Sequence, residues 1–322
     1  MFEHHVGIDI SKLHIDVSVE MKGKVKHRQF ANSQKGFEAL LEWCEKFGIR
    51  DAHFCMEATG AFWLAPATFL AERSLAVSVV NPSCVKRFAQ RELKRTKTDK
   101  VDAGIIARFC RAMVPALWQP LPPECPTLQQ LVRRVYDLTK MRQQERNRYS
   151  SQSLDGVSLE SVKRMLKFIE QEIDKLKRQI EKLLRKHPAL QKQRELLLSI
   201  PGIGPDTAHV VMAEVPCIEM FHSAKQLVAY AGMAPKEIRS GHSMHGRTRI
   251  SKTGRSRLRS ALYLPTVTSK KYNPVIQAFC ARLLANKKAP MKVVGAAMRK
   301  LLHIVYGVLK SGKPFCADLA GT

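Results

Sequence analysis

The feature that most constrains the fold is a run of apolar residues spaced alternately by four and three positions in the middle of the chain. Its members are Val162, Leu166, Ile169, Ile173, Leu176, Ile180 and Leu183. Heptad spacing puts these side chains on one stripe of a single long helix, and a second helix has to cover that stripe. The cover can be the preceding helix, near residues 128–149, or a second copy of the chain, and both can coexist. Residues 116–187 are therefore expected to form a linker and a helical coiled-coil arm between two domains.

The residues before this arm, 1–115, have the pattern of an α/β domain. Period-two alternation predicts half-buried strands, and longer amphipathic runs predict helices. The expected elements are strands at 5–10, 13–19, 24–30, 52–56 and 75–80, and helices at 37–47, 63–71, 83–93 and 99–113. Short breaks between the first three strands favour an antiparallel meander. This order is the one found in RNase H-like folds, although the pattern alone does not single that fold out.

Charge identifies the class of partner. The 322 residues include 54 Lys and Arg against 28 Asp and Glu, a formal net charge of +26, and no carboxylate occurs between Glu237 and Asp318. An ordinary solvated surface mixes both signs, so part of this segment is expected to face phosphates. There is no apolar run of ~18 residues and no cleavable leader, which argues against a membrane or secreted protein. Eight scattered cysteines favour a reduced, cytoplasmic protein without structural disulfides.

Four carboxylates stand out in the first domain. Asp9 interrupts an apolar strand, Glu57 follows another strand, and Asp99 and Asp102 share one face at the start of a helix. If these groups converge, each pair at ~4 Å repels by about 4 kcal/mol at an effective dielectric of ~20. Divalent cations such as Mg²⁺ or Mn²⁺ would offset that repulsion. The alternative is that Asp99 caps a helix, Asp102 complements the helix dipole and Glu57 is a loop charge.

The last domain, 188–322, is expected to be mainly helical and to contain two motifs. Residues 196–208, LLLSIPGIGPDTA, indicate two helices joined by a tight glycine turn, which suits a helix-hairpin-helix that grips a DNA phosphate. The alternative is a turn that serves packing alone. Residues 231–254 lack core periodicity and combine Gly, Ser, His and Arg. They could present a hydroxyl nucleophile beside guanidinium groups, or they could form a solvated phosphate-gripping loop in which the serines only hydrogen-bond. The expected nucleic-acid contacts are Gly202, Gly204, Arg239, Arg247, Arg249, Lys252, Arg255 and Arg257.

Together these motifs resemble the DEDD transposases of bacterial insertion sequences, whose first domain is similar to the RuvC resolvase and which include bridge-RNA-guided recombinases. The similarity covers nearly the whole chain. The motifs that carry it are GIDISK at 7–12, EATG at 57–60, KTDKVDA at 97–103, IPGIG at 200–204, YAGMAP at 230–235, Ser240-Gly241, and ISKTG at 250–254 with Arg257-Leu258-Arg259.

The resemblance implies a mechanism and a set of partners. Asp9, Glu57, Asp99 and Asp102 would be the metal-binding tetrad, and Ser240 would form a covalent phosphoserine link to DNA. Ser243 lies in the same loop, and the Ser-Gly pairing favours Ser240. The implied partners are donor and target DNA, a structured guide RNA that supplies sequence choice, and further copies of the chain, as a dimer or tetramer through the arm. The implied location is cytoplasmic and nucleoid-associated.

Two other functions compete with this one. A structure-selective RuvC-like nuclease would use water as its nucleophile and leave Ser240 idle. A non-catalytic nucleic-acid scaffold would bind through the basic half, and its carboxylates would be structural. His242 and His245 lie in the serine loop without an assigned role.

Overall fold

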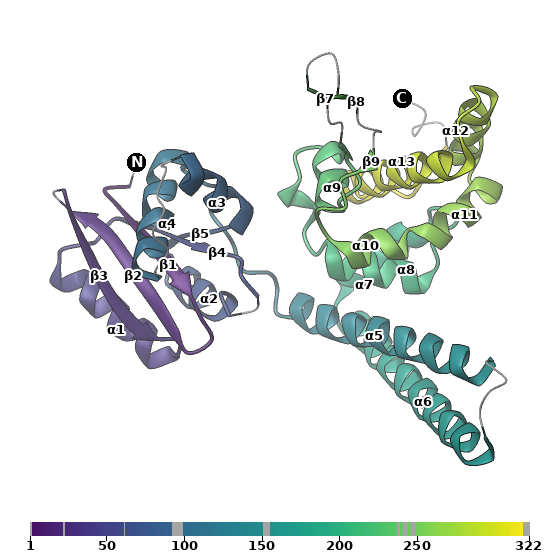
Figure 1. Ribbon diagram of the computed structural model, residues 1–322, viewed down its shortest axis with the longest axis horizontal. Coiled ribbons are helices and arrows are strands. Elements are labelled where there is room, and N and C mark those ends of the chain that lie inside the picture. The colour runs from purple at the N-terminus through teal and green to yellow at the C-terminus, as the bar shows by residue number, and fades with distance from the viewer. Residues whose placement is uncertain are drawn as a thin grey trace. The chain divides into compact units, whose positions relative to one another are not determined.

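The structure is a computed structural model of the chain. It describes residues 2–21, 23–60, 62–91, 99–150, 155–236, 239–240, 244–245 and 249–317, and for residues 99–100, 239–240 and 244–245 it describes the backbone alone. The chain divides into two compact units, Met1–Pro120 (unit 1) and Leu121–Thr322 (unit 2) (Figure 1). Each unit has its own hydrophobic core.

Unit 1 is built on a five-stranded mixed sheet in the order β3-β2-β1-β4-β5. Its strands are β1 (His4–Ile10), β2 (His14–Met21), β3 (Lys24–Ala31), β4 (Ala52–Glu57) and β5 (Ala76–Val80). The first three form the predicted antiparallel meander, and β4 joins β1 in parallel and continues the sheet to β5. The five predicted strands are confirmed, and burial is strongest in β1, β2 and β4, whereas the edge strand β3 buries only Phe30.

Helices cover both faces of this sheet. α1 (Gln34–Lys46) and α2 (Leu64–Glu72) pack on the face that carries Val6 and Ile8. α3 (Pro82–Arg91) and α4 (Asp99–Met113) pack on the opposite face, around Cys55. Ser33 begins α1 as its N-cap, because its side chain accepts a hydrogen bond from Gly36 N.

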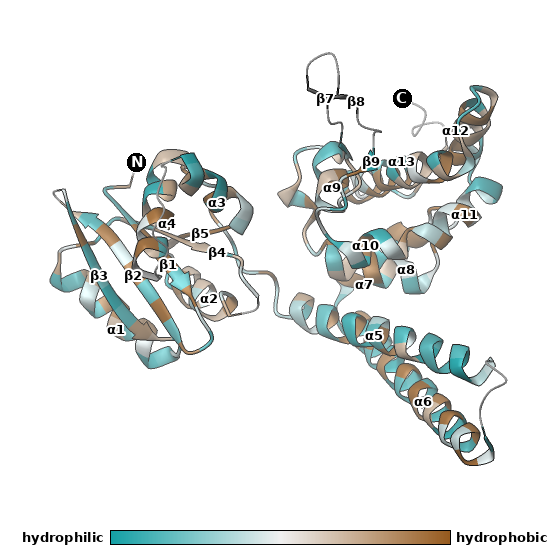
Figure 2. Ribbon diagram, viewed as in Figure 1, coloured by the Kyte–Doolittle hydropathy of each residue, from teal (hydrophilic) through white to brown (hydrophobic). Residues whose placement is uncertain are grey.

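The arm is a helical hairpin within unit 2. α5 (Glu124–Ser150) packs along α6 (Gly156–Lys186), and apolar residues recur along α6 in Figure 2. Leu138 of α5 meets Ile169 and Ile173 of α6, so the heptad stripe is covered inside one chain. α6 also exposes Phe168 by 58%. A partner copy on the arm therefore stays a prediction.

The rest of unit 2 is mainly helical. Its elements are α7 (Pro188–Leu198), α8 (Pro205–Glu214), η1 (Ile218–Met220), α9 (Ala224–Tyr230), α10 (Ser256–Ala261), α11 (Tyr263–Tyr272), α12 (Pro274–Ala285), α13 (Pro290–Ser311), and the short strands β6 (Pro235–Lys236), β7 (Arg239–Ser240), β8 (Met244–His245) and β9 (Arg249–Ile250). β6 pairs with β9 and β7 pairs with β8, both antiparallel. No helix in the described part of the chain is long and apolar enough to cross a membrane.

The arm begins a few residues earlier than the sequence pattern indicated, because α5 starts at Glu124 and includes Pro126. Pro126 fits in the first helical turn, where its missing N–H costs no hydrogen bond. The expectation of a mainly helical last domain is confirmed, and the two short strand pairs between Pro235 and Ile250 are the additional elements that the sequence did not predict.

Candidate functional site

Asp9 and Glu57 lie on neighbouring parallel strands, at the ends where both strands finish. Gly7 and Cys55 are partners in the β1–β4 register, and the two carboxylates follow them by two positions. Because side chains alternate along a strand, Asp9 and Glu57 leave the sheet on the same face as Gly7 and Cys55. Both are half-buried. Asp9 also accepts a hydrogen bond from Ile10 N at 3.0 Å.

The acid-bearing helix α4 lies on that same face and runs antiparallel to β1. Cys110, near its end, donates to the His53 carbonyl at the start of β4, at 3.7 Å. The middle of α4 packs directly against Gly7, where an added Cβ would be 2.1 Å from Ala103 O. The first turn of α4, with Asp99 and Asp102, is therefore at the sheet edge where Asp9 and Glu57 lie.

This edge offers carboxylate oxygens and the positive end of a helix dipole, a chemistry that suits hard divalent cations. Asp102 is half-buried, and of Asp99 only the backbone is described. Among the described side chains, no three of His, Cys, Asp or Glu come close enough to hold a metal ion. The backbone thus brings the segments of the tetrad together, and the metal site itself stays a prediction.

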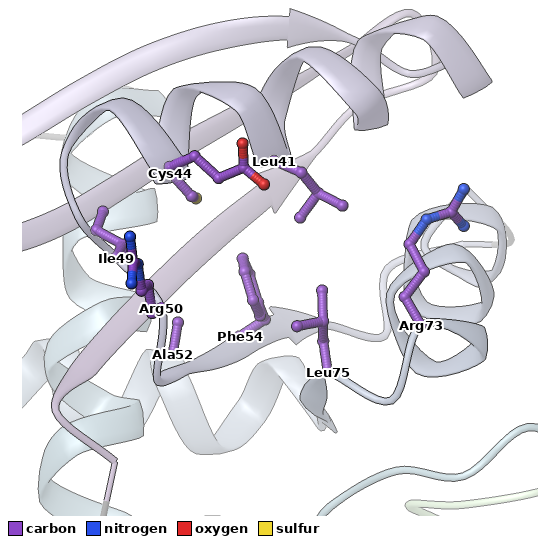
Figure 3. A pocket seen from close by; sticks show the side chains of 9 residues that line it. Leu41, Cys44, Ile49, Arg50, Ala52, Phe54, Arg73 and Leu75 are labelled. Atoms are coloured by element: carbon purple, nitrogen blue, oxygen red, sulfur yellow. The ribbon is translucent and has the colours of Figure 1, made fainter.

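Unit 1 also contains a hollow of about 520 Å³, whose lining side chains are drawn in Figure 3. It is lined by α1 and by Ala52 and Phe54 of β4, with Arg50 and Arg73 at its margin. Phe54 belongs to the core under α1, on the face opposite Cys55. None of the predicted site residues lines this hollow.

The predicted hairpin of unit 2 is present as α7, the turn 199–204 and α8. Gly202 has φ +101°, and an added Cβ would be 2.1 Å from Ser269 Oγ, so α11 packs directly against the turn. Packing thus accounts for Gly202. Gly204 is the exposed N-cap of α8, and no atom of the described residues lies within 4 Å of an added Cβ. Asp206 in the first turn of α8 pairs with Lys177 at 2.7 Å.

The segment that contains Ser240 is closed at its base by a narrow stem, residues 230–236 and 249–255 (the loop stem). Gly232 and Gly254 have positive φ, and a Cβ on Gly254 would be 2.7 Å from Gly232 N. Ser251 N donates to Ala234 O at 2.8 Å, and Lys252 N donates to Gly232 O at 2.9 Å. Glycine is required where two backbones approach this closely, which explains the glycines of the YAGMAP and ISKTG motifs.

Beyond the stem, the backbone of Ser240 pairs with Met244 and that of Arg239 with His245. The predicted residue Arg247, together with Ser243 and His242, lies outside the described residues. The structure therefore describes Ser240 only as part of the short strand β7, and its role as nucleophile stays a prediction.

Four of the basic residues predicted to contact nucleic acid lie in the loop stem and α10 with described side chains, and they differ in their surroundings. Arg249 and Lys252 are exposed. Arg255 Nε instead donates to the Tyr230 hydroxyl at 2.8 Å, and Arg257 Nη2 lies 3.5 Å from Asp137 Oδ1 on α5. Both guanidinium groups thus help to hold unit 2 together, a role that the sequence motifs did not indicate.

Sequence reasoning also missed a buried carboxylate below the loop stem. Glu214, at the end of α8, is 3% exposed and is paired with Arg133 of α5 at 3.0 and 3.4 Å. No local pattern distinguishes it from an exposed helix-end residue, because its partner is 81 residues away in the chain. Tyr230 is the first residue of the YAGMAP motif, and that motif is the one feature of the sequence that singled Tyr230 out.

Comparisons with known proteins agree with this two-part organisation. Residues 6–159 match the transposase family of the DEDD IS110 type, and residues 194–281 match the family described as transposase IS116/IS110/IS902. The chain is 33% identical to a pilin gene-inverting protein of Moraxella lacunata and to one of Moraxella bovis, in each case over 318 residues that cover 98% of both proteins. It is 29% identical over 137 residues to an uncharacterized insertion-element protein of Streptomyces coelicolor, which covers 42% of the chain and 33% of that protein. The chain therefore belongs to the IS110 family of DEDD transposases.

Proposed function

We propose that the chain is the transposase and site-specific recombinase of an insertion sequence, and that it cuts and rejoins DNA through a covalent serine–DNA intermediate. The observation that carries the proposal is the meeting of Asp9, Glu57 and the first turn of α4 at one edge of the sheet. Similarity over nearly the full length to proteins named for inverting a pilin gene supports a reaction that rearranges DNA.

The sheet order and its helices support the finer assignment of unit 1 to the RuvC-like RNase H fold. In this proposal Asp9, Glu57, Asp99 and Asp102 would hold Mg²⁺, for which Mn²⁺ could substitute. The chemistry that such ions supply is neutralisation of charge at the scissile phosphate and at the leaving oxygen. The four carboxylates would hold such ions, and the dipole of α4 would lower the cost of gathering negative charge at this edge.

Ser240 is the proposed nucleophile. Its hydroxyl oxygen attacks phosphorus, the phosphorus–oxygen bond to the departing strand breaks, and a phosphoserine ester forms. The serine hydroxyl loses one proton in this step, and the oxygen of the released DNA strand gains one. A hydroxyl of the second strand then attacks the phosphoserine and releases the serine, so no phosphodiester energy is lost to water. The exposed Arg249 and Lys252 beside the loop would attract the DNA backbone.

The proposed partners are donor and target DNA, a structured guide RNA, and further copies of the chain that dock on the coiled-coil arm. The net charge of +26 and the absence of carboxylates between Glu237 and Asp318 support a polyanionic partner. The helix-hairpin-helix of α7 and α8 would grip a phosphate through Gly204 and the start of α8. If an RNA is bound, protein purified at moderate salt carries nuclease-sensitive absorbance near 260 nm, and nucleic-acid-free protein at that stage contradicts this part of the proposal.

Two substitutions with matched controls test the chemistry. Asp9→Asn should abolish DNA rearrangement and the covalent protein–DNA species, whereas Asp51→Asn, at an exposed acidic residue of unit 1, should keep both. Ser240→Ala should abolish the covalent species and joining, whereas Ser243→Ala should keep them. Full rearrangement by Asp9→Asn would refute the acidic site. Cutting that survives in Ser240→Ala would instead indicate hydrolysis by a RuvC-like nuclease.

A further inference from the structure

The two ends of the loop stem are tied to each other twice, at Tyr230 and Arg255. Arg255 N donates to Tyr230 O at 2.9 Å, and Arg255 Nε donates to the Tyr230 hydroxyl at 2.8 Å. The Arg255 guanidinium also lies over the Tyr230 ring, 5.2 Å from its centroid. This closing pair stands where the segment that contains Ser240 leaves α9 and returns to α10.

The closing pair contacts Glu214 at the buried C-terminal end of α8. The Tyr230 hydroxyl donates to the Glu214 carbonyl at 3.0 Å, and Arg255 Nε is 4.0 Å from Glu214 Oε2. Burial raises the pKa of Tyr230, so the hydroxyl keeps the proton that it donates. The Tyr230 hydroxyl therefore connects the stem to the helix beneath it, donating one hydrogen bond and accepting another.

Glu214 extends this connection to the arm. Its two carboxylate oxygens accept hydrogen bonds from Nε and Nη2 of Arg133 on α5. Gln129, one turn earlier on α5, donates to Ala213 O at 2.8 Å. A buried ion pair is seldom more stabilising than a well-packed apolar pair, but its directional bonds permit one geometry. The cluster is thus suited to fixing where the stem stands on α5 and α8.

We infer that Tyr230, Glu214 and Arg133 are positioning residues that hold the loop stem so that Ser240 meets its phosphate. The inference rests on the proposed function, because it assumes that Ser240 is the nucleophile. These three residues act through the stem and do not touch DNA. The backbone hydrogen bonds of the stem would still keep its two ends together without this cluster, but the stem would lose its fixed orientation on the helices below.

The sharpest test is Tyr230→Phe, which removes one hydroxyl and keeps the ring that packs on Phe221. Its matched control is Tyr306→Phe, because the Tyr306 hydroxyl is also half-buried in unit 2 and donates to a carbonyl, Phe221 O, at 3.2 Å. The full chain is mixed with its DNA and RNA, and the rate of covalent adduct formation, the DNA dissociation constant and the midpoint of thermal unfolding are measured.

Tyr230→Phe should slow adduct formation by about tenfold or more, since small errors in the alignment of reacting groups are costly, while DNA affinity stays within about twofold. Its melting midpoint should fall no further than that of Tyr306→Phe, which should form adduct at the wild-type rate. The Mg²⁺ concentration for half-maximal adduct formation should not move, because the proposed ligands are in unit 1. Glu214→Gln, which keeps the shape and loses the charge, should show the same selective defect.

Two results overturn the inference, and they are distinguishable. If Ser240→Ala abolishes the adduct and Tyr230→Phe forms it at the rate of Tyr306→Phe, the positioning role is wrong and the proposed function stands. If Ser240→Ala still forms the adduct, the nucleophile is wrong and the positioning role fails with it.

Discussion

Replacing Gly7 by alanine tests how the acid-bearing helix is held on the sheet. The added Cβ would lie 2.1 Å from Ala103 O and 2.3 Å from Ala107 N, and both atoms belong to the backbone of α4. Real Cβ contacts essentially never fall below 3.0 Å, so α4 must retreat from β1 by about 1 Å. Overpacking of this kind costs about 1–3 kcal/mol, and the preference of a strand for alanine over glycine returns only about 0.5–1 kcal/mol.

Gly104→Ala is the matched control for Gly7→Ala. Gly104 lies beside Ala103 on α4, yet among the described atoms a Cβ there would meet only Arg108 Nη1, at an ordinary 3.6 Å. Because alanine favours a helix over glycine, this variant should be more stable than wild type by about 0.5–1 kcal/mol. The two substitutions, the same in chemistry, are therefore expected to change stability in opposite directions.

Urea unfolding followed by tryptophan fluorescence measures this difference in unit 1 alone, because the three tryptophans of the chain, Trp43, Trp63 and Trp118, belong to its core. With a slope of ~2 kcal/mol per molar urea, a net loss of ~1.5 kcal/mol lowers the midpoint by about 0.7 M. A shift of ~1 Å in the first turn of α4 should also slow DNA cleavage by up to about 10²-fold. A midpoint for Gly7→Ala equal to or above wild type would show that α4 is not seated on β1 in this register.

Three further predictions concern unit 2. Ile169→Ala should destabilise the arm by about 2–5 kcal/mol, measured by circular dichroism at 222 nm during urea unfolding, and the exposed Phe168→Ala should cost no more than about 0.5 kcal/mol; equal effects would contradict the hairpin. Burial lowers the pKa of His209 below its ordinary value, so the unfolded chain binds a proton at His209 more readily than the folded chain does, and the free energy of unfolding falls as the pH drops below about 6.5. His209→Gln should therefore reduce the dependence of the free energy of unfolding on pH between pH 7.5 and 5. An unchanged pH dependence would refute this prediction. Arg249→Ala and Lys252→Ala should each weaken DNA binding and reduce the slope of log affinity against log salt by about one, whereas an unchanged slope would exclude a phosphate contact.

The sequence was most informative where the determinants are local. Strand alternation predicted the meander because neighbouring residues decide which face is buried. The heptad stripe likewise predicted α6 from 162 to 183. It could not choose between an internal and an external cover, because the residue that meets Ile169 is Leu138, in another helix. The short strands β6 to β9 were not predicted either, since two-residue pairs leave no periodicity to detect.

Long-range contacts account for most of the remaining differences. Arg255 and Arg257 carry the positive charge expected of residues that bind a phosphate. The sequence does not show that Arg255 instead contacts Tyr230, or that Arg257 contacts Asp137, which is 120 residues away. Gly202 was expected to expose its backbone to DNA, yet its lack of a side chain is already required by Ser269. The sequence left open whether the segments that carry the tetrad converge, because the parallel pairing that ends β1 and β4 at the same sheet edge joins strands that are far apart in the chain.

The acidic edge and the serine loop are held in place by different residues, so substitutions can perturb each of them independently. The acidic edge depends on α4 seated on Gly7, inside the cores of unit 1, whereas the loop stem depends on Glu214 and Tyr230, beside the core of unit 2. Effects of distant substitutions that share no contacts add, so defects from the two units should multiply in rate if one phosphate requires both. A variant that combines Gly7→Ala and Tyr230→Phe should therefore form adduct at the product of the two fractional rates. A rate no lower than that of the slower single variant would mean that the acidic edge and the serine loop do not act in the same step.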